Sequence, residues 1–300
     1  MKTHKNILIV FLLNLLFSLF EFVGGIITGS VALASDAVHD LGDALSIGIS
    51  YLLERKSKSK PDCDYTYGYL RYSVLGSIFT TMILLLGSVA VIYNAITRIF
   101  NPVPINYNGV IIFAVIGLAV NFFAALITRQ SESINQKAVN LHMLEDMLGW
   151  IVVLIGAVVM RFTDFAIIAP LLSITVAVYI FTGAVKILKQ ALDLFLEKSP
   201  PNLNLNEIKA HICSIEGVKD VHHIHIWSLD GVTNIATMHI VTDAESTLIK
   251  GRVREELAEF GISHSTLEIE KNNEKCCDEI CNINLKTEIG HHCHHSHKHS

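Results

Sequence analysis

The sequence predicts an α-helical membrane protein with six transmembrane helices, followed by a small α+β domain in the cytosol. Its composition supports this class, since 51% of the 300 residues are hydrophobic and only 17% are charged, unlike an ordinary soluble domain. Apolar runs of about 20 residues, each long enough to cross a bilayer, fill the first two thirds of the chain. Beyond Pro200 the apolar residues recur in the shorter helix and strand patterns of a soluble fold.

Six apolar runs form the predicted transmembrane domain, residues 1–199, and they lie at about 6–28, 31–53, 74–97, 107–128, 138–160 and 166–190. Lys and Arg residues are enriched on the cytoplasmic side of membranes. One set of alternating connections holds twelve of them: Lys2, Lys5, Arg55, Lys56, Lys58, Lys60, Arg71, Arg129, Lys137, Lys186, Lys189 and Lys198. The opposite connections hold only Arg98 and Arg161. We therefore expect both termini in the cytoplasm, and the short connections favour the plasma (inner) membrane of a prokaryote.

Residues 200–270 form the predicted cytosolic domain, which follows the helix-ending pair Pro200–Pro201. Its helical and strand patterns alternate along the chain: helix 203–215, strands 218–229 and 232–242, helix 246–260 and strand 263–270. Asp230–Gly231 predicts a two-residue hairpin turn. The order αββαβ is typical of a small ferredoxin-like or metallochaperone-like domain, with one sheet covered by helices.

The chain from Pro200 onward is acidic, with 15 acidic and 9 basic residues. Such a charge attracts cations and disfavours nucleic acid as a partner. The final segment, 271–300, loses periodicity and mixes six histidines with Cys276, Cys277, Cys281 and Cys293. This composition predicts a disordered tail that captures metal in a reducing compartment, and a dispensable appendage is the alternative.

Two His-x-x-x-Asp pairs lie inside apolar runs: His39 with Asp43, and His142 with Asp146. An ionisable group at the centre of a transmembrane helix costs about 2.5–3.5 kcal/mol on insertion scales, so such residues need a function. Residues four apart share one face of a helix. Two such faces turned toward each other offer two imidazoles and two carboxylates. The sequence therefore predicts one metal site at bilayer depth.

Two imidazoles and two carboxylates suit tetrahedral Zn²⁺. The absence of thiolates disfavours Cu(I), and the small number of oxygen ligands disfavours Mg²⁺ and Ca²⁺, whereas Co²⁺, Cd²⁺ and Ni²⁺ remain open. A purely structural alternative is that each pair is a hydrogen-bonded couple that joins helices. Asp36, three residues before His39, fits either as a ligand or as a residue that orients the imidazole. Asp40 is expected to face away from the site.

The predicted hairpin supports a second metal site in the cytosolic domain. His222 and His239 each lie eight residues from the Asp230–Gly231 turn, so they should face each other across the hairpin. His264, before the last strand, could complete the ligand set. His223 is expected on the opposite face of its strand, in a structural role. The alternative is that these histidines are merely surface or hydrogen-bonded residues.

Five motifs in order resemble those of the cation diffusion facilitator transporters, and the resemblance covers about residues 7–270: SDAVHDLGDALS, YTYGYLR, TRIFNP, LHMLEDMLGW and VHHIHIWSLDG. Since His-x-x-x-Asp stands on both the second and fifth helices, the chain is similar to the zinc-transporting branch. The resemblance implies a homodimer in the bilayer that exchanges cytosolic divalent metal for protons by alternating access. It implies a transport site of His39, Asp43, His142 and Asp146.

The resemblance also implies metal at His222, His239 and His264, where zinc would be a regulatory ligand as well as the substrate, and it implies no organic cofactor. The loop after the second helix departs from the family pattern, because Tyr69 and Ser73 replace its His and Glu. No metal site is therefore expected there.

Two alternative functions make different demands on the sequence. An intramembrane metalloenzyme would need a motif such as His-Glu-x-x-His, which the sequence lacks. A membrane-anchored metal sensor would not need His–Asp pairs at bilayer depth.

Overall fold

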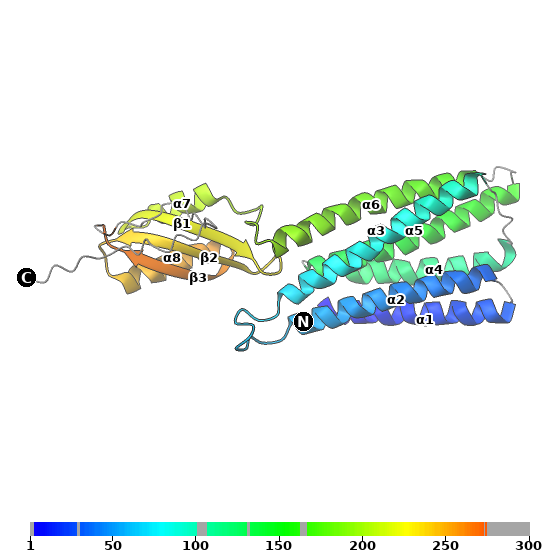
Figure 1. The fold of residues 1–300 in the computed structure, drawn as a ribbon, viewed down its shortest axis with the longest axis horizontal. Helices are drawn as coiled ribbons and strands as arrows, with labels where there is room; N and C mark the ends of the chain where they lie inside the picture. Colours follow the sequence, from blue (N-terminus) through cyan, green and yellow to red (C-terminus); the bar gives the residue numbers. More distant parts are fainter. Residues whose placement is uncertain are drawn as a thin grey trace, which may run out of the picture. The chain divides into compact units, whose positions relative to one another are not determined.

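A computed structural model describes residues 3–28, 31–100, 107–130, 133–162, 167–272 and 274. The chain divides into two compact units, and the boundary between them falls at Leu196 and Glu197, shortly before the expected division at Pro200. The first unit is a bundle of long helices, and the second contains a sheet with two helices (Figure 1). The Cys/His-rich tail and the outer connections lie outside the described residues.

The described residues of the first unit form six helices: α1 (Thr3–Thr28), α2 (Val31–Ser57), α3 (Arg71–Phe100), α4 (Tyr107–Thr128), α5 (Ile134–Phe162) and α6 (Ile168–Phe195). Among the described residues, five of these helices contain a segment long and apolar enough to cross a membrane. The exception is α2, which carries three aspartates in its first half and the Glu54–Arg55–Lys56 sequence near its end. These features therefore identify five candidate spans, and α2 as a sixth stays a prediction.

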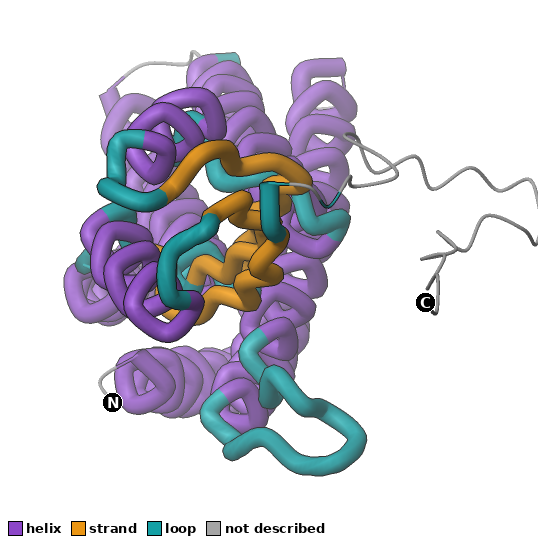
Figure 2. The backbone as a smooth tube through the Cα atoms, turned by 90° about the vertical axis from the view of Figure 1, so that its left-hand side faces the viewer, coloured by secondary structure: helices purple, strands orange, loops and turns teal. Residues whose placement is uncertain are grey.

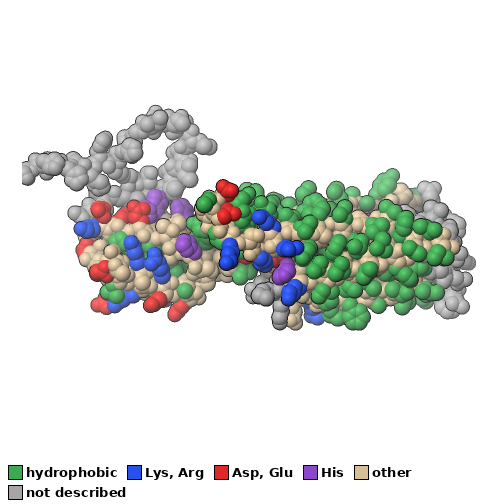
Figure 3. Space-filling model, turned by 90° about the horizontal axis from the view of Figure 1, so that it is seen from below, with side chains coloured by type: hydrophobic (Ala, Val, Ile, Leu, Met, Phe, Trp, Pro, Cys, Tyr) green, Lys and Arg blue, Asp and Glu red, His purple; other side chains and the backbone are tan. Residues whose placement is uncertain are grey.

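The helical unit has an apolar exterior and a partly polar interior. Hydrophobic side chains cover most of the face of this unit that Figure 3 shows. The exposed hydrophobic residues include Leu16, Leu86 and Tyr179. By contrast, Asn14, Ser18 and many other hydroxyl and amide side chains are buried between helices. This distribution suits a protein whose surrounding solvent is lipid, where exposed apolar groups cost nothing and buried polar groups join helices.

The second unit has the predicted element order, with α7 (Leu205–Cys213), β1 (Val218–Ser228), β2 (Asn234–Thr242), α8 (Ser246–Glu259) and β3 (Ile262–Glu270). The strands form one sheet in the order β1-β2-β3, in which β1–β2 is antiparallel and β2–β3 is parallel. Both helices contribute to a single core against one face of the sheet (Figure 2), through Ile208, Ile212, Ile249, Val253 and Leu257. The expected α+β domain with one sheet covered by helices is therefore present.

The β1–β2 hairpin differs from the predicted two-residue turn. Ser228 pairs with Asn234, and the Leu229 amide donates to the Thr233 carbonyl at 3.0 Å, so the connection is longer. A bulge between His222 and His225, where His223 has a φ of +52°, then shifts the register back. The two displacements cancel, so His222 does pair with His239 as expected.

Candidate functional site

Asp43 of α2 links the two His-x-x-x-Asp pairs. Its Oδ2 lies 3.6 Å from His39 Nε2 on the same helix, and its Oδ1 lies 3.5 Å from His142 Nε2 on α5. The carboxylate is almost fully buried, as is His142. Asp43 thus lies beside two imidazoles, of which His142 is buried inside the bundle.

Asp146, one turn beyond His142, completes a compact group. Ligand atoms of Asp43, His142 and Asp146 all lie within 4.8 Å of one another. Ligand bonds of about 2.0–2.2 Å put the donors around a tetrahedral ion roughly 3.3 Å apart, so a small contraction would let these three hold one zinc ion. Neither ring nitrogen of His142 makes a hydrogen bond within the described part of the chain. A ring nitrogen of His142 is therefore available to bind a metal ion.

His39 is placed differently from the other three predicted ligands. Its side chain is 65% exposed, and it does not belong to the compact group of Asp43, His142 and Asp146. It lies on the wall of an adjoining cavity. The structure therefore brings three of the four predicted ligands together and leaves His39 beside them, 3.6 Å from Asp43. The side chain of Asp36 lies outside the described residues.

The cavity beside this group has a volume of about 680 Å³ and is lined by α2, α3 and α5, with Ser173 from α6. Asp40 lines it, so the expectation that this residue faces away is wrong. The reason is that the cavity contacts more of the circumference of α2 than the one face that His39 and Asp43 share. Glu145, which the sequence gave no reason to choose over Asp146, also lines it and accepts a hydrogen bond from Ser88 at 3.3 Å.

A second group lies on the exposed face of the sheet in the other unit. Donor atoms of His222, His239 and Glu270 lie within 4.8 Å of one another. His239 Nδ1 is 2.6 Å from Glu270 Oε1, and His222 Nε2 is 3.2 Å from Glu270 Oε2. Glu268 approaches His239 Nε2 at 3.2 Å. Two imidazoles and one or two carboxylates again form a set suited to zinc.

His264 does not join this group within one chain. In the parallel pairing of β2 with β3, His239 is opposite Glu268, whereas His264 is opposite Ile235. At about 3.3 Å per residue, His264 is too far along the strand to share an ion with His239. The prediction of His264 as the third ligand is therefore wrong for a site within one chain, and Glu270 lies beside His222 and His239 instead. Nothing in the sequence signalled Glu270, because the direction and register of β3 are not local properties.

His223 also differs from its predicted position. The bulge breaks the alternation of side chains in β1, and the His223 ring lies 4.8 Å from the His239 ring, measured between centroids. The expectation that it faces away is wrong for this reason.

Replacing Glu270 with Ala should weaken zinc binding at the cytosolic group by at least about tenfold, as losses of metal-site partners typically do. Replacing His264 with Ala should leave the affinity unchanged. Competition between the purified full-length protein and a chromophoric chelator measures both variants. An equal loss in the two variants would instead restore His264 to the ligand set.

The α2–α3 loop holds a carboxylate that is already occupied by hydrogen bonds. The Tyr69 hydroxyl donates to Asp62 Oδ2 at 2.5 Å, and the amides of Asp64 and Tyr65 donate to Oδ1 at 3.1 and 2.8 Å. The Tyr69 hydrogen bond, followed by the Tyr65 amide, lowers the pKa of Asp62, and the same bond raises the pKa of Tyr69 to about 12. Tyr69, which stands where the family motif has a histidine, thus stabilises the conformation of this loop through its hydrogen bond to Asp62.

Comparisons with known proteins cover nearly the whole chain. Residues 7–196 match the family described as the cation efflux transmembrane domain, and residues 200–272 match the cation efflux protein cytoplasmic domain. A zinc transporter, ZitB, of Yersinia pestis is 32% identical over 305 residues, which cover 99% of this chain and 97% of that protein. A cadmium, cobalt and zinc/H(+)-K(+) antiporter of Bacillus subtilis is 30% identical, covering 97% and 96%. The metal cation efflux system protein CzcD of Cupriavidus metallidurans is 30% identical, covering 89% and 86%.

Proposed function

The chain belongs to the cation efflux family, the cation diffusion facilitators, and from this premise we propose that it exports Zn²⁺ from the cytosol in exchange for protons. It is an integral membrane protein and a transporter of metal cations, not an enzyme. The proposal concerns the preferred metal, the exchanged ion and the residues that bind the metal.

The observation that carries the proposal is the group of Asp43, His142 and Asp146, whose donor atoms lie within 4.8 Å of one another in a helical unit with an apolar surface. Neutral imidazole and ionised carboxylate bind either a proton or a metal ion, so protonation lowers metal affinity. We assign these three residues and His39 as the transport site. Zinc would bind while the site faces the cytosol, and protons would displace it when the site faces the other side.

The names of the relatives support zinc as the first candidate and cobalt and cadmium as further ones, since the relatives are named as transporters of these metals. Nickel suits the same ligand types. The match to the cytoplasmic domain supports a homodimer. We assign His222, His239 and Glu270 to a regulatory site, where bound zinc would bias the transport equilibrium. We further propose that all six helices span the membrane, that both termini lie in the cytoplasm and that the protein resides in the inner membrane of a bacterium.

Uptake of zinc into vesicles containing the purified protein tests this function. With an acidic lumen, lumenal zinc should rise faster than in vesicles without a pH gradient, because protons leaving the lumen drive metal entry. An ionophore that collapses the gradient should remove the difference, and competing Co²⁺, Cd²⁺ and Ni²⁺ would rank the metals. Uptake that ignores the gradient would contradict proton exchange. A protein that binds zinc but moves none would instead be a membrane-anchored sensor.

A further inference from the structure

A carboxylate is fully buried far from the transport site. Glu54 of α2 has no exposed surface and lies eleven residues beyond Asp43, which is roughly 16 Å along a helix. At this end of the bundle α2 ends, and α3 and α5 begin. Burying a carboxylate is costly unless its oxygens are satisfied, so the contacts of Glu54 need an explanation.

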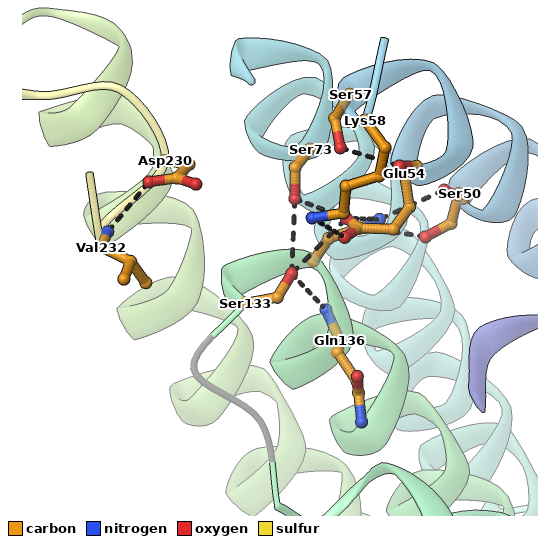
Figure 4. Close-up of polar contacts among 10 residues, drawn as sticks. Ser50, Glu54, Ser57, Lys58, Ser73, Ser133, Gln136, Asp230 and Val232 are labelled. Atoms are coloured by element: carbon orange, nitrogen blue, oxygen red, sulfur yellow. Dashed lines mark hydrogen bonds and ion pairs between the residues drawn. The ribbon is translucent and has the colours of Figure 1, made fainter. Parts of the chain in front are cut away.

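Glu54 joins three helices. Figure 4 shows the Ser73 hydroxyl of α3, which donates to Glu54 Oε2 at 2.5 Å. The Asn135 amide of α5 donates to the same oxygen at 3.3 Å. Lys58 Nζ lies 3.2 Å from Oε1. Ser50, one turn before Glu54, donates to Asn135 Oδ1 at 2.7 Å. We call Glu54, Ser73 and Asn135 the latch.

A glycine allows α3 to approach the latch closely. A Cβ atom at Gly76 would lie 2.8 Å from Asn135 Oδ1 and 2.9 Å from its Nδ2. The amide cannot easily swing aside, because Asn135 is held by Ser50 and Glu54 at the same time. The latch is therefore tightly packed as well as hydrogen-bonded.

Between the latch and Asp43 lies a buried polar stripe. On α2, Ser46 and Ser50 follow Asp43 at helical spacing. On α3, Ser77 and Thr80 follow Ser73, which contacts Glu54 of α2, at the same spacing. Ser46, Ser50, Ser77 and Thr80 are all at most 2% exposed. The hydroxyls of Ser46, Ser77 and Thr80 find no hydrogen-bond partner among the described residues. Unsatisfied hydroxyls are costly in a permanently dry interior, and water that entered this space in another conformation would satisfy them.

The open cavity extends in the other direction. From the level of Asp43 and His142 its lining continues to Val38 on α2, Val91 on α3 and Val153 on α5. These positions lie toward the start of α2 and toward the ends of α3 and α5. One side of the site is thus open in this structure, while the side that leads to Glu54 is packed shut.

We propose that Ser46, Ser50, Ser77 and Thr80 line the closed half of the divalent-cation path, and that the latch closes its mouth. The proposal rests on the proposed function, with Glu54 at the cytosolic end. When the latch separates, α3 moves away from α2 and α5, water reaches the stripe, and the freed Glu54 carboxylate draws cations into the path. In the closed state the same carboxylate accepts the hydrogen bonds that hold the helices together.

The test measures access to the stripe. A Ser77→Cys reporter in the full-length protein, held in lipid nanodiscs without added metal, is treated with a water-soluble maleimide. Modification at position 77 is followed by peptide mass spectrometry, which separates it from the six native cysteines. The reporter should react slowly. Adding Glu54→Gln should raise its rate at least about tenfold, because a charge-assisted contact between helices is lost.

Two further variants make the result specific. Gly76→Ala displaces Asn135 and should also raise the rate, without changing Glu54. Asp64→Asn removes a carboxylate from the exposed α2–α3 loop and should leave the rate unchanged. If Glu54→Gln fails to give a monodisperse protein, Gly76→Ala and Ser73→Ala replace it.

Equal rates with the latch intact and broken would overturn the proposal, as would rapid labelling before any latch change. The assay needs neither metal nor a pH gradient. The labelling assay therefore tests the latch, and zinc uptake tests the proposed function, so either proposal can fail while the other holds.

Discussion

Zinc uptake should be lost when Asp43 is replaced by Asn. Asp43 is the side chain that approaches both His39 and His142, at 3.6 and 3.5 Å, and it also belongs to the compact group with Asp146. Asn keeps the size of the side chain but removes the charge that balances the metal ion. Loss of a residue that merely supports a metal ligand typically costs about 10–100-fold in affinity, so loss of a ligand's charge should lower metal affinity at least about 100-fold. The measurement is the initial rate of zinc uptake into vesicles with an acidic lumen.

The matched control for this prediction is again Asp64→Asn, which makes the same chemical change in an exposed loop. It should transport zinc at the rate of the unmodified protein. Both variants should elute as the same oligomer in size-exclusion chromatography, so that lost uptake cannot be assigned to misfolding. Normal uptake by Asp43→Asn would contradict the assignment of the transport site.

The two membrane histidines should differ in importance. Replacement of His142 with Ala should abolish zinc binding at the membrane site, because this imidazole is buried within the group of Asp43 and Asp146. Replacement of His39 with Ala should leave weakened binding, since its side chain is 65% exposed and lies outside that group. A water molecule can occupy the fourth position of a zinc ion held by three protein ligands. The sequence motifs alone make the two histidines equivalent.

Equilibrium dialysis with radioactive zinc checks this ranking in a Glu270→Ala background, which weakens the cytosolic site. Since that background is shared, differences between the variants report the membrane site. The expected order of affinity is unmodified, then His39→Ala, then His142→Ala. The reverse order would show that His39 is the principal imidazole ligand. It would contradict the ranking based on the burial of His142 beside Asp43 and Asp146. Equal losses would indicate a four-ligand site in which both histidines bind the ion.

Sequence patterns predicted much of the membrane unit and part of its chemistry. Apolar runs located the long helices, and the spacing of His142 and Asp146 put two donors on one face of a helix. The same reasoning failed for Asp40, which lines the cavity, and gave no role to Glu54, whose partners Ser73 and Asn135 come from other helices. Those contacts depend on how α3 and α5 pack against α2.

The cytosolic domain separates local from distant information in the same way. The alternating apolar pattern predicted β1, β2 and β3, and the distances along the chain from Asp230–Gly231 predicted that His222 faces His239. That pairing is present, although the turn is longer than expected and the bulge at His223 restores the register. A prediction from the hairpin pattern succeeded here because two displacements cancelled.

Periodicity along the chain was therefore enough to identify helices, strands, the membrane environment and the His–Asp pairs, because these follow from the local placement of apolar and polar residues. The packing of α2, α3 and α5 and the parallel register of β3 required the folded structure. They bring Glu270 rather than His264 to His222 and His239, leave His39 beside the group of Asp43, His142 and Asp146, and bury Glu54 between helices. These contacts join residues far apart in the chain, and the spacing of residues within one helix or strand does not encode them.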